Sequence, residues 1–353
     1  MNPVQPLTRR RFCAAVASTL AVAGCGAAAV PPTPTIIAPI NLPTATAAPV
    51  AGKLLITTQG NFFDFDLATL RETQLTHFPQ DSFAASPSLS PDRSKVAYSF
   101  YVLPKNESDL GGSDLSLMDV TGADPRVVRA HGTPGVSFEE PCWTSDGSGI
   151  LCTQRTTVYN QGNYQGVKVQ VVRIGLDGSG PAAVVADAQS PATSPDGKHL
   201  AYLTVDQQGA TSKLWIGAAS GAGAKDLLGT QNFTYIRAPR LSADSTRIAF
   251  GAVGGPPVAT PAKSSGLVSP LALLRPAVAE AHGIAWEIWT VAPDGSDLRR
   301  LTHVQEDSPI PAWSPDGKWV AFAGEVGLYL VDAEGHQTLR LSTKTSGGGL
   351  AWL

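Results

Sequence analysis

A short motif recurs five times along this chain, and the repetition limits the fold more than any other feature of the sequence. The last copy reads Pro-Ala-Trp-Ser-Pro-Asp-Gly over 311–317 and continues as Trp-Val-Ala-Phe over 319–322. The Asp of the motif recurs at Asp92, Asp146, Asp196, Asp244 and Asp316. Successive copies lie about 50 residues apart, with a longer gap of 72 before the last copy. A period near 50, built from short apolar runs and turn residues, predicts a β-propeller rather than a solenoid of helices.

Each repeat contains four short segments of strand character, separated by turn residues. In the last repeat the expected strands are 312–314, 320–323, 327–332 and 338–341. Third strands of the other repeats are expected at 114–120, 169–176, 213–218 and 287–292. Gly-containing turns such as Asp177-Gly178 and Asp294-Gly295 follow two of them, as is typical of hairpins. We therefore predict blades of four antiparallel strands.

The two ends of the repeat region look like parts of one further blade. Residues 53–76 supply a second, third and fourth strand without a first one, at 54–57, 62–66 and 73–76. Leu-Ala-Trp-Leu at 350–353 matches the first strand at 311–314. Pairing of the C-terminal strand with the N-terminal blade would complete the array and remove its exposed edges. The predicted fold class is all-β: a six-bladed β-propeller over 53–353.

These repeats resemble those of the PD40, or TolB-like, family of six-bladed β-propellers, whose motif reads Pro-x-Trp-Ser-Pro-Asp-Gly followed by Ile-Ala-Phe. The resemblance implies a propeller over 53–353 and, for function, non-catalytic binding of envelope proteins or peptides at a mouth of the central channel. Fold alone is a weak guide to function. A propeller enzyme, such as a hydrolase or lyase acting on glycans with its site in the channel, is the alternative, and an architectural spacer without a ligand is a third.

Residues 1–24 have the composition of a signal peptide, with three consecutive Arg, no acidic residue and then a short apolar run. Thirteen apolar residues rise only about 20 Å as a helix, too little to span a bilayer. Thr-Arg-Arg-Arg-Phe resembles the twin-arginine export motif, which gives Arg9, Arg10 and Phe12 the role of export signal. A general secretory leader with an Arg-rich start is the alternative.

Cys25 directly follows this leader. Val22-Ala23-Gly24-Cys25 resembles the bacterial lipobox, which implies lipidation of Cys25 and export with anchoring to the cell membrane, facing the periplasm or the extracellular side. An ordinary buried Cys is the alternative. Residues 25–52 are rich in Pro, Thr and Ala, a composition that favours an extended tether.

Removal of the leader makes the chain distinctly acidic. The whole sequence has 26 basic and 29 acidic residues, and residues 1–24 take away three Arg, which leaves 23 against 29 and a net charge of −6. Binding to nucleic acid needs clustered Lys and Arg. We therefore expect no nucleic-acid partner, and we expect the exported domain to be a monomer.

The sequence offers few signs of catalysis. It contains no Gly-x-Ser-x-Gly elbow, P-loop or His-Glu-x-x-His motif, and its six His are dispersed. We therefore predict no enzyme activity, no catalytic residue, no cofactor and no metal. The five motif Asp could form an acidic ring, but each follows Ser and Pro, or their substitutes, in a turn. There a carboxylate accepts hydrogen bonds from backbone N–H groups, so we assign these Asp a structural role.

Charged residues are also expected in the connections from one blade to the next, which lie at one mouth of a propeller channel. They are Asp81, Glu139, Glu140, Arg237, Glu306 and Asp307. Such a mostly acidic mouth would attract a basic peptide or a cation. A solvated rim without a ligand is the alternative.

Two further features remain open. Cys142 and Cys152 flank a hairpin centred on Gly147, which would place them opposite one another on one face and permit a disulfide, the alternative being two buried thiols. Residues 252–285 are an insertion that accounts for the long gap between motifs. An insertion of this length could contact the membrane or a partner, or could be passive.

Overall fold

The computed structural model describes residues 42–104, 111–132, 135–161, 163–205, 211–256, 286–344 and 347–353. The predicted signal peptide with Arg9, Arg10 and Phe12, the lipidation site Cys25, and the tether up to residue 41 lie outside these residues. Positions 257–285 of the predicted insertion lie outside them as well.

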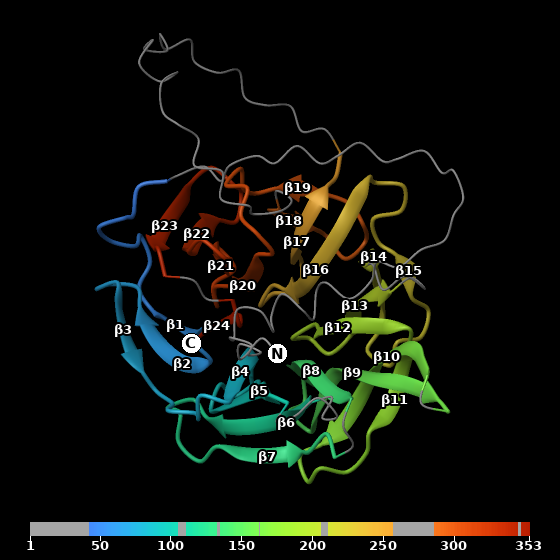
Figure 1. Ribbon diagram of the computed structural model, residues 1–353. Coiled ribbons are helices and arrows are strands. Elements are labelled where there is room, and N and C mark those ends of the chain that lie inside the picture. Colours follow the sequence, from blue (N-terminus) through green and yellow to red (C-terminus); the bar gives the residue numbers. More distant parts are fainter. Residues whose placement is uncertain are drawn as a thin grey trace, which may run out of the picture. The chain divides into compact units, whose positions relative to one another are not determined.

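The described residues form six blades of four strands each, numbered here along the chain (Figure 1). Blade 1 contains β24 (Leu350–Trp352), β1 (Lys53–Thr58), β2 (Asn61–Asp66) and β3 (Arg71–Gln74). Blade 2 contains β4 (Ser82–Leu89), β5 (Lys95–Val102), β6 (Gly112–Asp119) and β7 (Arg126–Arg129). Blade 3 contains β8 (Val136–Trp143), β9 (Gly149–Asn160), β10 (Asn163–Gly175) and β11 (Ala182–Ala186).

The second half of the chain continues the same pattern. Blade 4 contains β12 (Ala188–Thr193), β13 (His199–Val205), β14 (Thr211–Ala218) and β15 (Lys225–Asp226). Blade 5 contains β16 (Phe233–Leu241), β17 (Ile248–Gly254), β18 (Glu287–Val291) and β19 (Arg299–Arg300). Blade 6 contains β20 (Ile310–Trp313), β21 (Trp319–Ala323), β22 (Leu328–Asp332) and β23 (Thr338–Ser342).

The first strands of the blades form a closed inner ring. Each contacts the next in the order β24, β4, β8, β12, β16, β20, and β20 returns to β24. Within each blade, neighbouring strands pair antiparallel, and one parallel bridge between Ser113 and Ser137 joins blades 2 and 3. We call the end of the ring at which the inner strands begin the mouth end. The all-β propeller predicted from the repeats is confirmed.

The two chain ends complete blade 1 as the sequence predicts. β24 pairs antiparallel with β1, with Leu54 opposite Trp352 and Ile56 opposite Leu350. Leu350 and Trp352 are buried in an apolar cluster that also includes Leu330 of blade 6. A strand of three residues therefore closes the ring, because it supplies hydrogen bonds on one edge and apolar side chains on its face.

The motif Trp packs against the preceding blade. Trp313 lies in a buried cluster with Ala249 and Ile288 of blade 5, and its indole N–H donates to the Arg240 carbonyl at 3.0 Å. Trp143 of blade 3 likewise donates to the Ser88 carbonyl of blade 2 at 3.0 Å. The Trp thus buries apolar area between blades and satisfies an inner-strand carbonyl.

Each motif Asp holds the turn between the first and second strands of its blade. In blade 5, Ser242 Oγ donates to Asp244 at 2.6 Å, and the Thr246 N–H donates to the same carboxylate oxygen at 3.1 Å. The Arg247 N–H closes the turn by donating to Ser242 Oγ at 3.0 Å. The same three bonds occur around Asp92, Asp146, Asp196 and Asp316. These hydrogen bonds give the motif Asp the structural role predicted for them.

Because β24 closes the ring, loss of its Trp side chain should lower the stability of the fold strongly. Trp352→Ala should cost about 3 to 5 kcal/mol of unfolding free energy, because it leaves a cavity between blades 1 and 6. Chemical denaturation followed by tryptophan fluorescence and circular dichroism would measure the loss. Val127→Ala, at a side chain that is 50% exposed on β7, is the control and should change stability by less than about 0.5 kcal/mol. Equal losses in both variants would contradict the closure argument.

The turn hydrogen bonds also predict how stability depends on pH. Bonds from Ser194 and then from the Lys198 N–H lower the pKa of Asp196 to about 2, from an ordinary value of 3.8. A group with a lowered pKa stabilises the fold above its unfolded pKa and loses this contribution as the pH falls through the folded pKa. The stability gap between the wild type and Asp196→Asn should therefore be fully present above about pH 5 and should close as the pH falls towards about 2. Denaturation curves at several pH values would test this, with Asp124→Asn as the exposed control.

Candidate functional site

The structure divides the predicted mouth residues into two groups. Asp81 and Asp307 lie in connections between blades, just before β4 and β20, as predicted. Glu139 and Glu140 instead lie inside β8, and Arg237 lies inside β16, so their predicted place in loops is wrong. The inner strands begin several residues before the motif Pro. Glu139, Glu140 and Arg237 are therefore strand residues rather than loop residues.

A repeated β-bulge explains why the inner strands extend so far. The residue before the motif Pro has a positive φ in four successive blades, at Ser86 (54°), Glu140 (51°), Ser190 (52°) and Ala238 (48°). Strand pairing shifts register at each of these points. A bulge inserts one residue and lets pairing resume beyond it, so the strand continues towards the mouth end.

The turn between β8 and β9 overturns the disulfide prediction. Cys142 lies opposite Leu151 rather than opposite Cys152, because Trp143 pairs with Ile150 and the turn is therefore centred between Asp146 and Gly147, not on Gly147. Side chains of adjacent residues point to opposite faces of a strand, so the two thiols lie on opposite faces of blade 3. Both cysteines are free, and Cys142 Sγ lies 3.4 Å from Thr193 Oγ1 of blade 4.

Glu139 and Glu140 lie in a polar cluster between blades 3 and 4, which we call the mouth cluster. Its members are Glu139, Glu140, Thr153, Arg155, Gln189 and Ser190. Arg155 Nε donates to Glu139 at 2.9 Å, and a second guanidinium nitrogen donates to Gln189 of the next blade. Glu140 accepts from Ser190 Oγ at 2.7 Å and from Thr153 Oγ1 at 3.1 Å. The cluster therefore links the inner strands of two blades and fixes both carboxylates.

Burial shapes the protonation of this cluster. The Glu139 side chain is 15% exposed and that of Arg155 is 32% exposed. Burial raises the pKa of Glu139, the charge on Glu140 raises it further, and Arg155 opposes both. Tyr101 of blade 2 stacks on Phe83 with ring centroids 4.6 Å apart. Burial, and then the charges of Glu139 and Glu140, raise the pKa of Tyr101 well above its ordinary value, so the phenol keeps its proton at neutral pH.

Two arginines, Arg237 and Arg240, also lie on the inner strand of blade 5. Burial lowers the pKa of Arg237, while the negative charges of Glu140, Asp307 and Glu325 oppose this shift. Burial likewise lowers the pKa of Arg240, whose guanidinium donates to the Pro239 carbonyl at 2.8 Å. The inner ring therefore presents both signs of charge, and the predicted mostly acidic mouth stays a prediction. The prediction covered only the connections between blades. It therefore missed Arg155, which lies on the second strand of blade 3, and Arg240, which directly follows the motif Pro.

Glu306, the remaining acidic residue of the predicted set, is a structural group. It is 1% exposed, and one carboxylate oxygen accepts from the Val326 N–H at 2.9 Å and from the Asp307 N–H at 3.0 Å. It ties the connection before β20 to the turn between β21 and β22.

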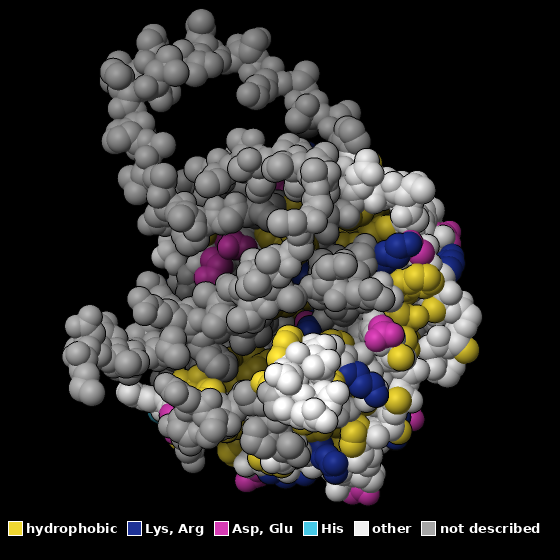
Figure 2. Space-filling view, turned by 45° about the vertical axis from the view of Figure 1, so that its right-hand side comes forward, with side chains coloured by type: hydrophobic (Ala, Val, Ile, Leu, Met, Phe, Trp, Pro, Cys, Tyr) yellow, Lys and Arg dark blue, Asp and Glu magenta, His cyan; other side chains and the backbone are white. Residues whose placement is uncertain are grey.

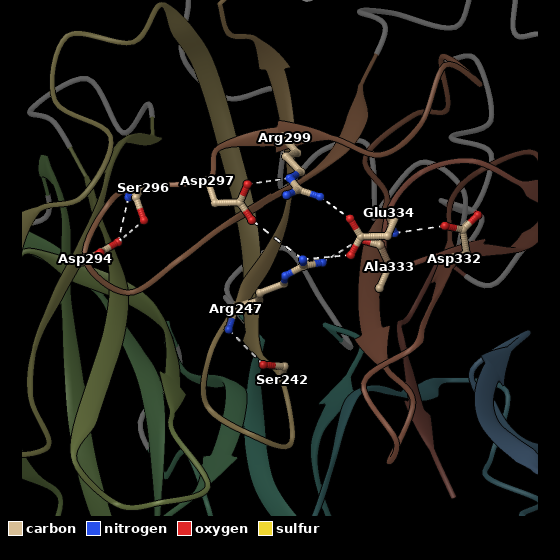
Figure 3. Close-up of polar contacts among 9 residues, drawn as sticks. All are labelled: Ser242, Arg247, Asp294, Ser296, Asp297, Arg299, Asp332, Ala333 and Glu334. Atoms are coloured by element: carbon tan, nitrogen blue, oxygen red, sulfur yellow. Dashed lines mark hydrogen bonds and ion pairs between the residues drawn. The ribbon is translucent and has the colours of Figure 1, made fainter.

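A second polar group lies at the opposite end of the ring, beside a cavity of about 510 Å³ between blades 5 and 6. Arg247 contacts Glu334 at 2.9 Å and Asp297 at 3.7 Å, and it donates to the Ala333 carbonyl at 2.8 Å (Figure 3). Arg299 contacts the same two carboxylates, with Asp297 at 2.6 Å. Two guanidinium groups and two carboxylates thus satisfy one another, and they join the outer parts of the two blades rather than offering an unpaired charge to a ligand.

Charged side chains of both signs are mixed on the described part of the face that Figure 2 shows. Within the described ranges, no group of three or more His, Cys, Asp or Glu side chains is arranged to hold a metal ion. No helix among the same residues is long and apolar enough to cross a bilayer.

Comparison with known proteins supports the fold and leaves the function open. No family model matches the chain. A segment of 37 residues, 10% of the chain, is 43% identical to the Tol-Pal system protein TolB of Nitratidesulfovibrio vulgaris, of which it covers 8%. TolB from Acinetobacter baumannii superposes with a TM-score of 0.56 at 16% identity, over 85% of this chain and 66% of that structure.

Two further solved structures have the same architecture. A putative TolB from Agrobacterium tumefaciens gives a TM-score of 0.53 at 16% identity, over 86% of this chain and 98% of that structure. A chain of a nidogen and laminin complex gives 0.57 at 11% identity, over 85% and 97%. The chain thus has a TolB-like β-propeller fold, and it spans just under two thirds of the Acinetobacter structure.

The ion pair of the mouth cluster yields a testable prediction. Arg155→Met should destabilise the fold by about 1 to 3 kcal/mol at pH 8, because it leaves the Glu139 carboxylate poorly compensated. Loss of Arg155 raises the pKa of Glu139 further, and a group with a raised folded pKa favours the fold below its unfolded pKa. The deficit should therefore shrink from pH 8 to pH 4. The control is Arg155→Met in a Glu139→Gln background: its deficit relative to Glu139→Gln alone should not vary with pH, because no carboxyl group is left at residue 139 to titrate.

Proposed function

We propose that this chain is an exported lipoprotein, anchored through Cys25, whose propeller binds protein or peptide partners at its mouth end without catalysing a reaction. The mouth cluster carries the proposal. Its carboxylates and its guanidinium are held by neighbouring blades before any ligand arrives, and Arg155 keeps a third of its side chain accessible. Preorganised groups of this kind lose little conformational entropy on binding, and Arg is enriched among residues that dominate binding energy.

The chemistry of the cluster favours recognition over catalysis. One oxygen of Glu139 accepts from Arg155, and one oxygen of Glu140 accepts from two hydroxyl groups, so both carboxylates help to hold blades 3 and 4 together. Two carboxylates, a guanidinium and an amide side chain offer both donors and acceptors, which suits the main chain and polar side chains of a peptide. The short sequence match to a Tol-Pal system protein and the TolB-like fold favour a partner in the cell envelope.

The anchoring part of the proposal rests on the leader and predicts a modified N-terminus. Mass spectrometry of the membrane fraction should find a lipidated peptide that begins at Cys25, and Cys25→Ser should release the protein from the membrane. Replacing Arg9 and Arg10 by Lys should block export if the twin-arginine route is used. An unmodified Cys25 in membrane-bound protein would overturn the anchoring claim.

The binding part can be tested by photo-cross-linking in intact cells. A photoreactive amino acid at Asp81, on the mouth end, should give a defined adduct. The same group at Lys318, whose side chain is 77% exposed at the opposite end, should give none. Charge reversal at Glu139, Glu140 and Asp307 together should reduce the Asp81 adduct at least tenfold in protein that still folds. Equal adducts from both ends, or none from Asp81, would contradict binding at the mouth.

A further inference from the structure

One hairpin of blade 3 is much longer than its counterparts. β9 has 12 residues and β10 has 13, whereas the second strand of blade 2 and the third strand of blade 4 have 8 each. Val136, the first residue of β8, lies opposite Thr156, so residues 157–167 extend past the inner strand at the mouth end. Four more residues on β9 carry the hairpin about 14 Å beyond it, at roughly 3.4 Å per residue.

The projecting part of this hairpin has one apolar face. Tyr159 lies opposite Tyr164, with ring centroids 6.0 Å apart, and Thr157 lies opposite Val167. A bulge between Tyr164 and Gly166 keeps all four on the same face. Tyr159 is 46% exposed, Tyr164 54% and Val167 46%. Four of the five large hydrophobic side chains that are exposed in the described part of the chain lie on this hairpin, the fourth being Val158.

The outer edge of the same segment is unpaired in the described structure. β11 pairs with β10 only from Gln170 to Arg173, and the Asp187 N–H reaches the Val169 carbonyl. Beyond that point, residues 163–168 of β10 pair with β9 alone. Exposed edges are usually protected by charge or Pro. Residues 157–168 contain one charged residue, Lys168, and no Pro.

We propose that this hairpin is a docking site for an extended polypeptide segment of a partner, which adds as a strand to the edge of β10 at residues 163–168. Unpaired N–H and C=O groups specify an extended main chain, since only a strand can satisfy a row of them. Alternate side chains of an added strand would lie beside Tyr164 and Val167, so the partner segment is uncharged and carries apolar residues at every second position. This docking site rests on the proposed binding function, and it specifies the partner as an extended, uncharged segment with alternating apolar residues.

The hairpin face is continuous with the mouth cluster. Arg155 lies two residues from Thr157 on β9, opposite Val169, and therefore on the same face as Tyr159, Tyr164 and Val167. A polypeptide bound to the hairpin can thus contact both its projecting apolar residues and the ion pair between Arg155 and Glu139. This continuity with the proposed binding surface favours a partner peptide over a second copy of the chain.

A defined peptide tests the proposal with the full chain carrying Cys25→Ser. The probe is a fluorescent nonapeptide of alternating Val and Thr with a Lys at each end, measured by fluorescence anisotropy. Tyr164→Lys and Val167→Lys should each weaken its binding at least tenfold. Val127→Lys places the same charge on a side chain of similar exposure on β7 and should change the affinity less than twofold. A peptide with Pro at its centre should bind at least tenfold more weakly, and the probe should slow hydrogen exchange at residues 163–168.

Other outcomes would overturn the inference. The inference fails if the probe does not bind, or if the Pro peptide binds as tightly as the probe. It also fails if Tyr164→Lys protein with the wild-type circular dichroism spectrum binds the probe as tightly as the wild type does. A dimer seen by sedimentation and abolished by Tyr164→Lys would assign the edge to a second copy instead. Failure of the peptide test with an intact Asp81 adduct would refute the hairpin site alone, whereas loss of that adduct refutes the proposed function itself.

Discussion

Pairing of strand edges is the constraint on which the rest of this structure depends. A sheet that ends at an exposed edge leaves a row of N–H and C=O groups without partners, and an array of six such sheets must also bury the faces between them. The ring of inner strands buries the faces, and pairing of β24 with β1 closes the ring. The apolar residues of β24 serve both purposes at once, which explains why three residues at the end of the chain repeat the first strand of the motif.

The motif contributes to this closure at three levels. Its Ser and Asp hold the turn, its Trp satisfies a carbonyl of the preceding blade, and its Pro follows a residue of positive φ. The residue of positive φ has the largest effect on the candidate site, because β8 continues past the bulge at Glu140 towards the mouth end. Glu140 is held there by hydroxyl groups from β9 and from blade 4. The mouth cluster is therefore a local consequence of the repeat, modified by side chains that only blade 3 carries.

Spacing and turn chemistry in the sequence were sufficient to predict the blades, the composite closure and the role of the motif Asp. These features depend on local patterns of two or five residues and on one long period, all visible in a linear sequence. Register across a bulge is not visible in this way. Nor is the exact centre of a turn: it lies between Asp146 and Gly147, which brings Leu151 rather than Cys152 opposite Cys142. The bulges themselves explain why the predicted loop positions of Glu139, Glu140 and Arg237 were wrong, and why Arg155 was not seen as their neighbour.

The long hairpin of blade 3 differs from the outer strands of the other blades in the side chains beside its unpaired edge. Its sequence from 157 to 168 alternates poorly and is rich in Asn, Gln and Gly, so the pattern predicted a third strand beginning only at residue 169. The outer strands of the other blades also have an unpaired edge, but each of them carries at least one charged residue, and the apolar side chains of the repeat are directed into the contacts between blades. The exposed Tyr and Val side chains of the projecting, almost uncharged hairpin are not buried in these contacts between blades. An unpaired edge with a single charged residue, beside exposed apolar side chains, is most simply understood as one whose partner comes from another polypeptide.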